Sequence, residues 1–245
     1  MNKTQMNCAK CRVAEKICRV EKGKWPKGCP TIEKRELMNY ALEKYDLPEN
    51  SDFARLSSIQ EAECYANRGQ KPFRMNPIKP RVEEIIEFSK KMGYSKLGVA
   101  FCGGVTNEAS ILVEILEKHG FEVVAVSCKV GGISKERLGV KEEEKIRIGE
   151  FEPMCNPIAQ AMFLNEEKTD FNIMVCLCVG HDSLFLKYIN PPTTVLATKD
   201  RVTCHNPLAV LYTSNSYYQR IKNLELGNDE EVKARLAAKK NEDLD

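Results

Sequence analysis

Short apolar runs alternate with longer amphipathic stretches between residues 81 and 212, and this alternation restricts the possible folds more than any other feature. Such a pattern is typical of a parallel sheet whose two faces are both covered by helices. We therefore predict an α/β, Rossmann-like doubly wound domain with a mostly parallel sheet. The expected elements are helix 81–93, strand 97–101, helix 106–119, strand 122–127, helix 156–166, strand 172–177, helix 182–189, strand 194–197 and a helical segment 206–212.

The rest of the chain is organised around this domain, which we place at residues 81–226 with a charged excursion at 129–152. Residues 1–45 are predicted to form a small four-cysteine metal-binding module that ends in a helix. Residues 46–80 are predicted to be a helical linker, with a helix near 53–67 followed by a segment, 68–80, that holds three prolines and a glycine. Residues 227–245 are a tail rich in Lys, Glu and Asp.

Eleven cysteines occur in the 245 residues. No apolar run approaches the roughly 20 residues of a membrane-spanning helix, and the first residues lack the apolar stretch of a signal peptide. We therefore expect a cytoplasmic protein without membrane association. Thiols stay reduced in that compartment, so dense cysteines in a chain of this size favour metal binding or redox work over disulfides.

The charges restrict the class of partner. The chain carries 37 basic and 35 acidic residues, a net charge of +2, and so has no polyanion-binding footprint. Nucleic acid is not expected as a partner. Nucleotide binding at residues 101–108 is also disfavoured, because this segment has neither GxGxxG nor a P-loop lysine. A small-molecule substrate or an electron-transfer partner remains.

Four cysteines near the N-terminus, Cys8, Cys11, Cys18 and Cys29, lie in a segment too short for a hydrophobic core of its own. A bound metal folds such segments. The single CxxC does not favour structural zinc, and the spacing matches neither ferredoxin pattern. An iron–sulfur cluster and zinc both remain open, and we favour the cluster because a second thiolate site would suggest electron transfer between the two.

That second site comes from the predicted strand ends. Cys102, Cys128 and Cys178 each follow a strand, and Cys155 precedes a helix. In an open parallel sheet, strand ends and helix N-termini line one crevice, where helix dipoles stabilise thiolates. We expect these four cysteines to meet there and to hold an iron–sulfur cluster of the 4Fe–4S type. Free cysteine is also a common small core residue, and packing is the expected role of the remaining ones, with Cys204 the doubtful case: Cys64, Cys176, Cys204.

Charged residues and glycines surround the predicted crevice. His181 is a candidate general acid or base, although His181 and Asp182 would serve equally as caps of the following helix. Lys199 and Arg201 could hold an anionic substrate or move protons. Three glycines would let the backbone approach a bulky cofactor closely: Gly103, Gly104 and Gly180.

Five motifs carry a resemblance to a known family. They are FCGG at 101–104, CKVGGI at 128–133, CNPIAQA at 155–161, LCVGHDSLF at 177–185, and KDRV at 199–202 followed by HNP at 205–207. Together they resemble an uncharacterised prokaryotic family whose members are labelled only as metal-binding proteins with a domain of unknown function. The resemblance covers nearly the whole chain. It implies that the four N-terminal cysteines form one site and that the four crevice cysteines belong to a second, whereas cysteine is not expected at positions 176 and 204.

The sequence thus predicts a two-site metalloprotein that carries out redox or sulfur chemistry on a small molecule, as an iron–sulfur oxidoreductase or a sulfur-handling enzyme. With all four crevice thiolates on iron, the cluster would be closed and would suit electron transfer. With three bound, one iron would be open and the fourth cysteine free as a nucleophile. The alternative is a non-enzymatic zinc or metal-binding protein for storage, sensing or delivery.

Overall fold

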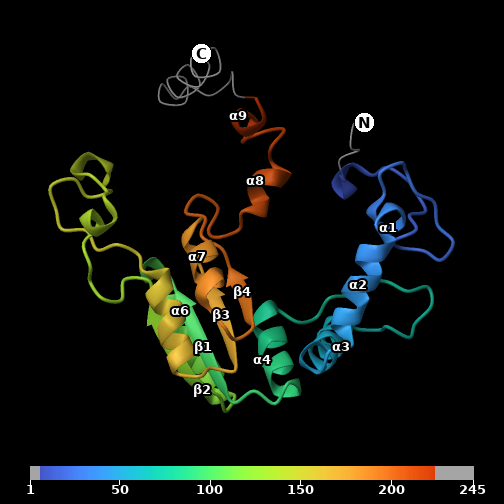
Figure 1. Cartoon of the computed structure of the whole chain (residues 1–245), viewed down its shortest axis with the longest axis horizontal. Helices are drawn as coiled ribbons and strands as arrows, with labels where there is room; N and C mark the ends of the chain where they lie inside the picture. The colour runs from blue at the N-terminus through green and yellow to red at the C-terminus, as the bar shows by residue number, and fades with distance from the viewer. Residues whose placement is uncertain (1–5, 224–245) are drawn as a thin grey trace. The chain divides into compact units, whose positions relative to one another are not determined.

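The computed structural model describes residues 6–223, so the predicted tail at 227–245 lies outside the described residues. The chain divides into two compact units, Met1–Met92 and Gly93–Asp245 (Figure 1). Within the described residues, no helix is long and apolar enough to cross a membrane.

The second unit is built on a sheet of four parallel strands, which confirms the expected α/β class. The strands are β1 (Lys96–Phe101), β2 (Glu122–Ser127), β3 (Phe171–Val175) and β4 (Thr193–Ala197). Their order across the sheet is β2-β1-β3-β4, and all neighbouring pairs are parallel. This order is consistent with a Rossmann-like arrangement.

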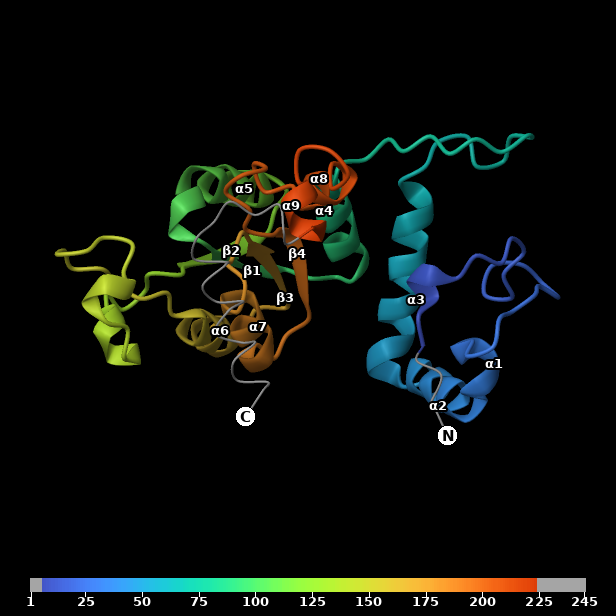
Figure 2. The same ribbon diagram turned by 90° about the horizontal axis from the view of Figure 1, so that it is seen from above.

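Helices lie on both faces of this sheet. Figure 2 shows α5 (Thr106–Lys118) on one side of the sheet and α6 (Pro157–Glu166) and α7 (His181–Tyr188) on the other. A right-handed connection between parallel strands requires this alternation when the chain reverses direction across the sheet. Two shorter helices follow β4: α8 (Leu208–Tyr212) and α9 (Gln219–Lys222). The described residues also contain four 3-10 turns: η1 (Cys8–Lys10), η2 (Gly103–Val105), η3 (Lys135–Leu138) and η4 (Glu142–Glu144).

The core of this unit lies between the sheet and its helices. Leu97, Val99 and Ile173 on the strands are completely buried, as are Leu116 of α5 and Leu164 of α6. Strands that are covered on both faces need apolar residues at successive positions rather than alternate ones. The continuous burial of β1 and β3 follows from that need.

β3 is shorter than predicted. The strand ends at Val175, whereas the apolar run favoured residues 172–177. Cys176 adopts a left-handed backbone with φ of +55°, and its N–H donates to Ala197 O at 2.8 Å. Cys176 is nevertheless buried, so packing describes its surroundings although it lies one residue beyond the strand.

The first unit contains α1 (Pro30–Glu33), α2 (Arg35–Tyr45), α3 (Pro48–Glu63) and α4 (Arg81–Lys91). α3 begins earlier than the expected residue 53, because Pro48 occupies the first helical turn, where its missing N–H costs no hydrogen bond. Between residues 6 and 63, no apolar side chain is buried. This part of the chain therefore has no hydrophobic core of its own.

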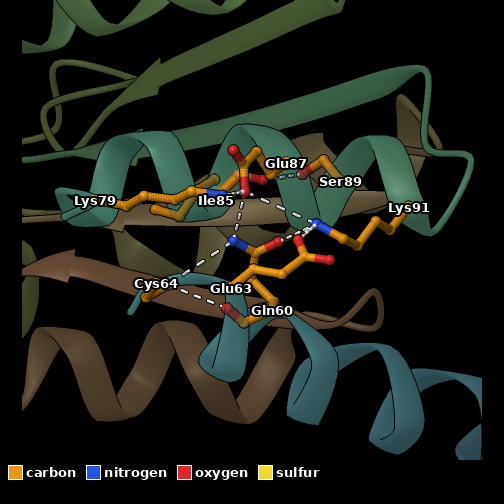
Figure 3. Close-up of polar contacts among 8 residues, drawn as sticks. All are labelled: Gln60, Glu63, Cys64, Lys79, Ile85, Glu87, Ser89 and Lys91. Carbon is orange, nitrogen blue, oxygen red and sulfur yellow. Dashed lines mark hydrogen bonds and ion pairs between the residues drawn. The ribbon is translucent and has the colours of Figure 1, made fainter. Parts of the chain in front are cut away.

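A buried polar network joins α3 to α4 (Figure 3). Gln60 donates to Glu87 at 2.8 Å, and Lys79 forms an ion pair with Glu87 at 2.6 Å. Lys91 pairs with Glu63 at 2.7 Å. Cys64 lies beside this network, where its thiol donates to Gln60 O at 3.1 Å. Burial raises the pKa of the Cys64 thiol, so it stays protonated as a packing residue.

Candidate functional site at the carboxyl edge of the sheet

The strand order places a topological switch point between β1 and β3, where successive connections leave the sheet on opposite faces. Ligands of open α/β sheets bind outside the carboxyl ends of the strands at such a point. Cys102 follows β1, and Cys178 lies three residues after the end of β3. The structure therefore places both residues at the position where this fold ordinarily binds ligands.

At this edge the Cys128 thiol contacts two other thiols. The side chain of Cys128 hydrogen-bonds with those of Cys102 and Cys155, and its sulfur accepts the Gly103 N–H at 3.3 Å. Cys102 and Cys128 are buried, whereas Cys155 is partly exposed. These three cysteines, called the thiol cluster below, come from three separate loops.

Backbone hydrogen bonds bring these loops together. The N–H of Cys128 donates to Phe101 O at 2.8 Å, which continues the β1–β2 ladder beyond the strands. Asn156 then donates its N–H to Cys128 O at 2.7 Å, while its side chain caps α6 by accepting from Ala159 N at 3.1 Å. Cys155 immediately precedes this cap, so the start of α6 fixes it beside Cys128.

Gln160 ties α6 to the same edge of the sheet. It is completely buried, and its amide donates to Val126 O at 2.7 Å and to Phe101 O at 3.2 Å. Phe101 is the last residue of β1 and Val126 the last but one of β2, so both carbonyls lie just before the loops that carry Cys102 and Cys128. Gln160 was not among the predicted site residues, although an amide among the apolar residues of the motif CNPIAQA was a signal for it.

Cys178, which lines the same edge of the sheet, is paired with an arginine. Its sulfur accepts a hydrogen bond from Arg201 Nη2 at 3.2 Å, and it is partly exposed. A guanidinium is a fixed cation with several donors, so Arg201 keeps further N–H groups for other acceptors. The four predicted crevice cysteines are thus three interacting thiols and one thiol paired with arginine.

Hydrogen bonding separates the acidities of the clustered thiols. The Cys128 thiol lowers the pKa of Cys102 to about 5, with further help from the Gly104 N–H and Lys199. The Cys128 thiol and then His181 lower the pKa of Cys155 to about 4. The hydrogen bonds with Cys102 and Cys155, together with burial, raise the pKa of Cys128. Cys128 therefore keeps its proton, and the two flanking sulfurs ionise readily.

His181 faces the thiol cluster and Asp182 does not. The hydrogen bond to Cys155 raises the pKa of His181, because the thiolate stabilises the imidazolium. Asp182 accepts the N–H groups of Gly180 at 2.9 Å and Ser183 at 2.7 Å. Asp182 thus binds amides at the start of α7, whose N-cap is Gly180 without a side-chain cap, and its catalytic role stays a prediction.

A cavity of about 440 Å³ opens over these groups. Its lining residues include three of the crevice cysteines, Gly104 and His181, together with basic side chains and an apolar rim from the excursion. They are Cys102, Gly104, Lys129, Lys135, Ile146, Arg147, Phe151, Glu152, Pro153, Cys155, Cys178, His181, Lys199 and Arg201. Of the three predicted cofactor-binding glycines, Gly104 lines the cavity; Gly103 contributes its N–H to Cys128, and Gly180 precedes α7 with φ of +85°.

The excursion that borders the cavity is held by its own ion pairs and leads away from the sheet (Figure 1). Lys145 is buried and pairs with Glu136 at 2.6 Å and Glu142 at 2.7 Å. Glu152 pairs with Lys135 at 2.5 Å and accepts the N–H groups of Ile146 and Arg147. Lys135, followed by these amides, lowers the pKa of Glu152 to about 2.

The segment 199–205 is a closed loop that presents Lys199 and Arg201. Asp200 accepts the N–H groups of Val202 at 3.0 Å and Thr203 at 3.1 Å, and its own N–H donates to His205 Nδ1 at 3.1 Å. The side chain of His205 therefore braces the loop instead of entering the cavity. Cys204 is exposed and lines neither this cavity nor the cysteine-lined cavity of the first unit.

The first unit holds a second cysteine-lined cavity, of about 420 Å³. Cys8, Cys11, Cys18 and Cys29 all line it. Gly28, buried next to Cys29 with φ of +83°, turns the chain there. Six basic residues share the lining: Lys10, Arg12, Lys16, Arg19, Lys24 and Lys27. In residues 6–223 as described, however, no three or more His, Cys, Asp or Glu side chains are grouped so as to hold a metal ion.

Comparisons with known proteins identify the family and no activity. Residues 29–196 match a family described as "Protein of unknown function (DUF1847)". The chain is also 45% identical over 213 residues to "Uncharacterized protein MJ0455" of Methanocaldococcus jannaschii, which covers 87% of this chain and 96% of that protein. The family match contains all four crevice cysteines and only Cys29 of the N-terminal four. The chain belongs to the DUF1847 family.

Proposed function

We propose that the protein is a two-site metalloprotein that performs redox or sulfur chemistry on a small molecule at the thiol crevice. The observation that carries this proposal is the division of the crevice cysteines. Cys128 interacts with both Cys102 and Cys155, while Cys178 is paired with Arg201. This division suits the open form of an iron–sulfur site, in which three thiolates bind and a fourth stays free.

The donor set fits such a cluster. Thiolates are the protein ligands of iron–sulfur clusters, and the flanking cysteines of the thiol cluster ionise readily. Cys128, which keeps its proton here, would lose it on binding, because metal ligation requires the thiolate. When bound, the cluster would supply an iron with an open coordination position. Cys178, His181 and Arg201 would then orient a substrate, hold a proton and screen negative charge.

The N-terminal cavity supports a second metal site in the first unit. Its four cysteines line one cavity, and residues 6–63 have no buried apolar side chain. A segment without a core gains its fold from a bound metal, and four thiolates suit either an iron–sulfur cluster or zinc. The surrounding basic residues would offset the negative charge of either centre.

Iron, zinc and acid-labile sulfide content, with a visible spectrum of protein purified without oxygen, test the proposal. The wild type should absorb broadly near roughly 400 nm and contain iron and sulfide. Cys102→Ser, Cys128→Ser and Cys155→Ser should each lower the iron content, whereas Cys178→Ser should leave it unchanged. Cys204→Ser is the matched control, because Cys204 is exposed and outside both cavities.

Two other results of these metal measurements would change the proposal. Equal loss of iron in all four crevice variants would indicate a closed cluster suited to electron transfer. A colourless protein with stoichiometric zinc would contradict the proposal and favour a non-enzymatic metal-binding role.

A further inference from the structure

Basic side chains from two separate segments converge on the thiol crevice. Lys129 follows β2, whereas Lys199 and Arg201 come from the loop after β4. All three line the same cavity of about 440 Å³. Among the described residues that line it, Glu152 is the single carboxylate, and it already pairs with Lys135.

The three cations lack carboxylate partners among the described residues. Within residues 6–223, none of them forms an ion pair with a carboxylate. Lys129 donates to Pro153 O at 2.6 Å, Arg201 donates to Cys178 Sγ, and Lys199 hydrogen-bonds with Cys102. Each cation is thus fixed by one contact and keeps further donors for another acceptor.

Space is left between these groups because position 104 has no side chain. A Cβ at Gly104 would lie 3.3 Å from Lys199 Nζ and 3.8 Å from Cys102 Sγ. The backbone at Gly104 does not adopt positive φ, so no backbone requirement accounts for glycine there. The absence of a side chain keeps the space beside the ammonium and the thiol open.

We propose that the crevice binds a small oxyanion of the sulfate or phosphate type among Lys129, Lys199 and Arg201, beside Cys102 and Cys178. Cations in a partly buried cavity bind such anions through charge-assisted hydrogen bonds, and guanidinium does so with two parallel donors. The further suggestion that this oxyanion is the substrate of the crevice rests on the function proposed above. Binding of the oxyanion can be measured separately from that function.

The test is titration of the anaerobically purified protein with inorganic sulfate and, separately, phosphate, by calorimetry at constant ionic strength in chloride. We expect saturable binding with one site per chain. Lys199→Gln and Arg201→Gln should each weaken it about tenfold or more, which is the effect of losing one charge-assisted hydrogen bond. Lys187→Gln is the matched control, because this exposed lysine of α7 lies outside the cavity and should leave the affinity unchanged.

Gly104→Ala keeps every charge and fills part of the space beside Lys199 Nζ, so it should weaken anion binding several-fold. If a charge variant fails to fold, Gly104→Ala tests the oxyanion site in its place. Absence of saturable binding by the wild type, or equal weakening by Lys187→Gln, would overturn the inference. Metal content measured on the same samples separates the two proposals. If the protein contains metal but does not bind the anion, the oxyanion site is wrong and the proposed function is unaffected. If the protein binds the anion but contains no metal, the proposed function is wrong and the oxyanion site is unaffected.

Discussion

At the scale of single residues, the crevice works through pairs of unlike groups. Cys128 keeps its proton and thereby stabilises the thiolates of Cys102 and Cys155. His181 adds a second donor to Cys155, whereas Arg201 donates a hydrogen bond to Cys178. Each of these contacts joins residues that lie more than 20 positions apart in the sequence.

The role of His181 predicts a change in thiol reactivity with pH. His181→Gln removes the imidazolium that favours the Cys155 thiolate, so the pKa of Cys155 should rise. Alkylation of Cys155 by iodoacetamide in metal-free, reduced protein should then begin at higher pH, as measured by mass spectrometry of the Cys155 peptide. Lys187→Gln is the control, because this exposed lysine of α7 lies outside the cavity. An unchanged alkylation profile in His181→Gln would show that His181 does not act on Cys155.

At the scale of elements, α6 positions the thiol cluster. Its capping residue binds the loop of Cys128, and Gln160 binds the carbonyls at the ends of β1 and β2. The helix therefore holds two cysteine loops in register with the sheet. A change in α6 should affect both stability and the thiols.

We expect Gln160→Ala to lower the free energy of unfolding by about 1–3 kcal/mol, because the two buried hydrogen bonds of its amide to Val126 O and Phe101 O are lost. Urea unfolding followed by circular dichroism measures this. Met162→Ala, on the exposed side of the same helix at 60% exposure, should cost less than about 0.5 kcal/mol. If both variants lost equal stability, the hydrogen bonds of Gln160 would not be the cause.

The elements also show what local pattern could predict. Helices and strands from residue 81 onwards lie close to their expected positions, because burial periodicity is a local property of the chain. The end of β3 differs, since an apolar run cannot reveal that Cys176 turns to a left-handed backbone. The start of α3 at Pro48 was also missed, although a proline in the first helical turn is a local signal for the beginning of a helix.

At the scale of the whole molecule, the two cysteine-lined cavities lie in different units. No cysteine is shared between them. Loading of one proposed centre should therefore not depend on loading of the other.

A Cys8→Ser, Cys11→Ser double variant tests this independence. If both units hold a cubane cluster, iron per chain should fall from about eight to about four, while the crevice cluster and sulfate binding persist. If the first unit holds zinc, the variant should lose zinc and keep its iron. Loss of all metal in the variant would contradict independent sites.

The sequence by itself determined the order of elements, the α/β class and the placement of cysteines after strands, because these depend on local periodicity and chain order. Only the tertiary structure decided the strand order β2-β1-β3-β4, the pairing of Cys178 with Arg201 and the contact of Cys155 with His181. These features join residues far apart in the chain, and their distances are set by packing of α6 and α7 on the sheet. A residue type and its position predict that a thiol reaches the crevice, but its neighbour there decides whether it is protonated, paired or free.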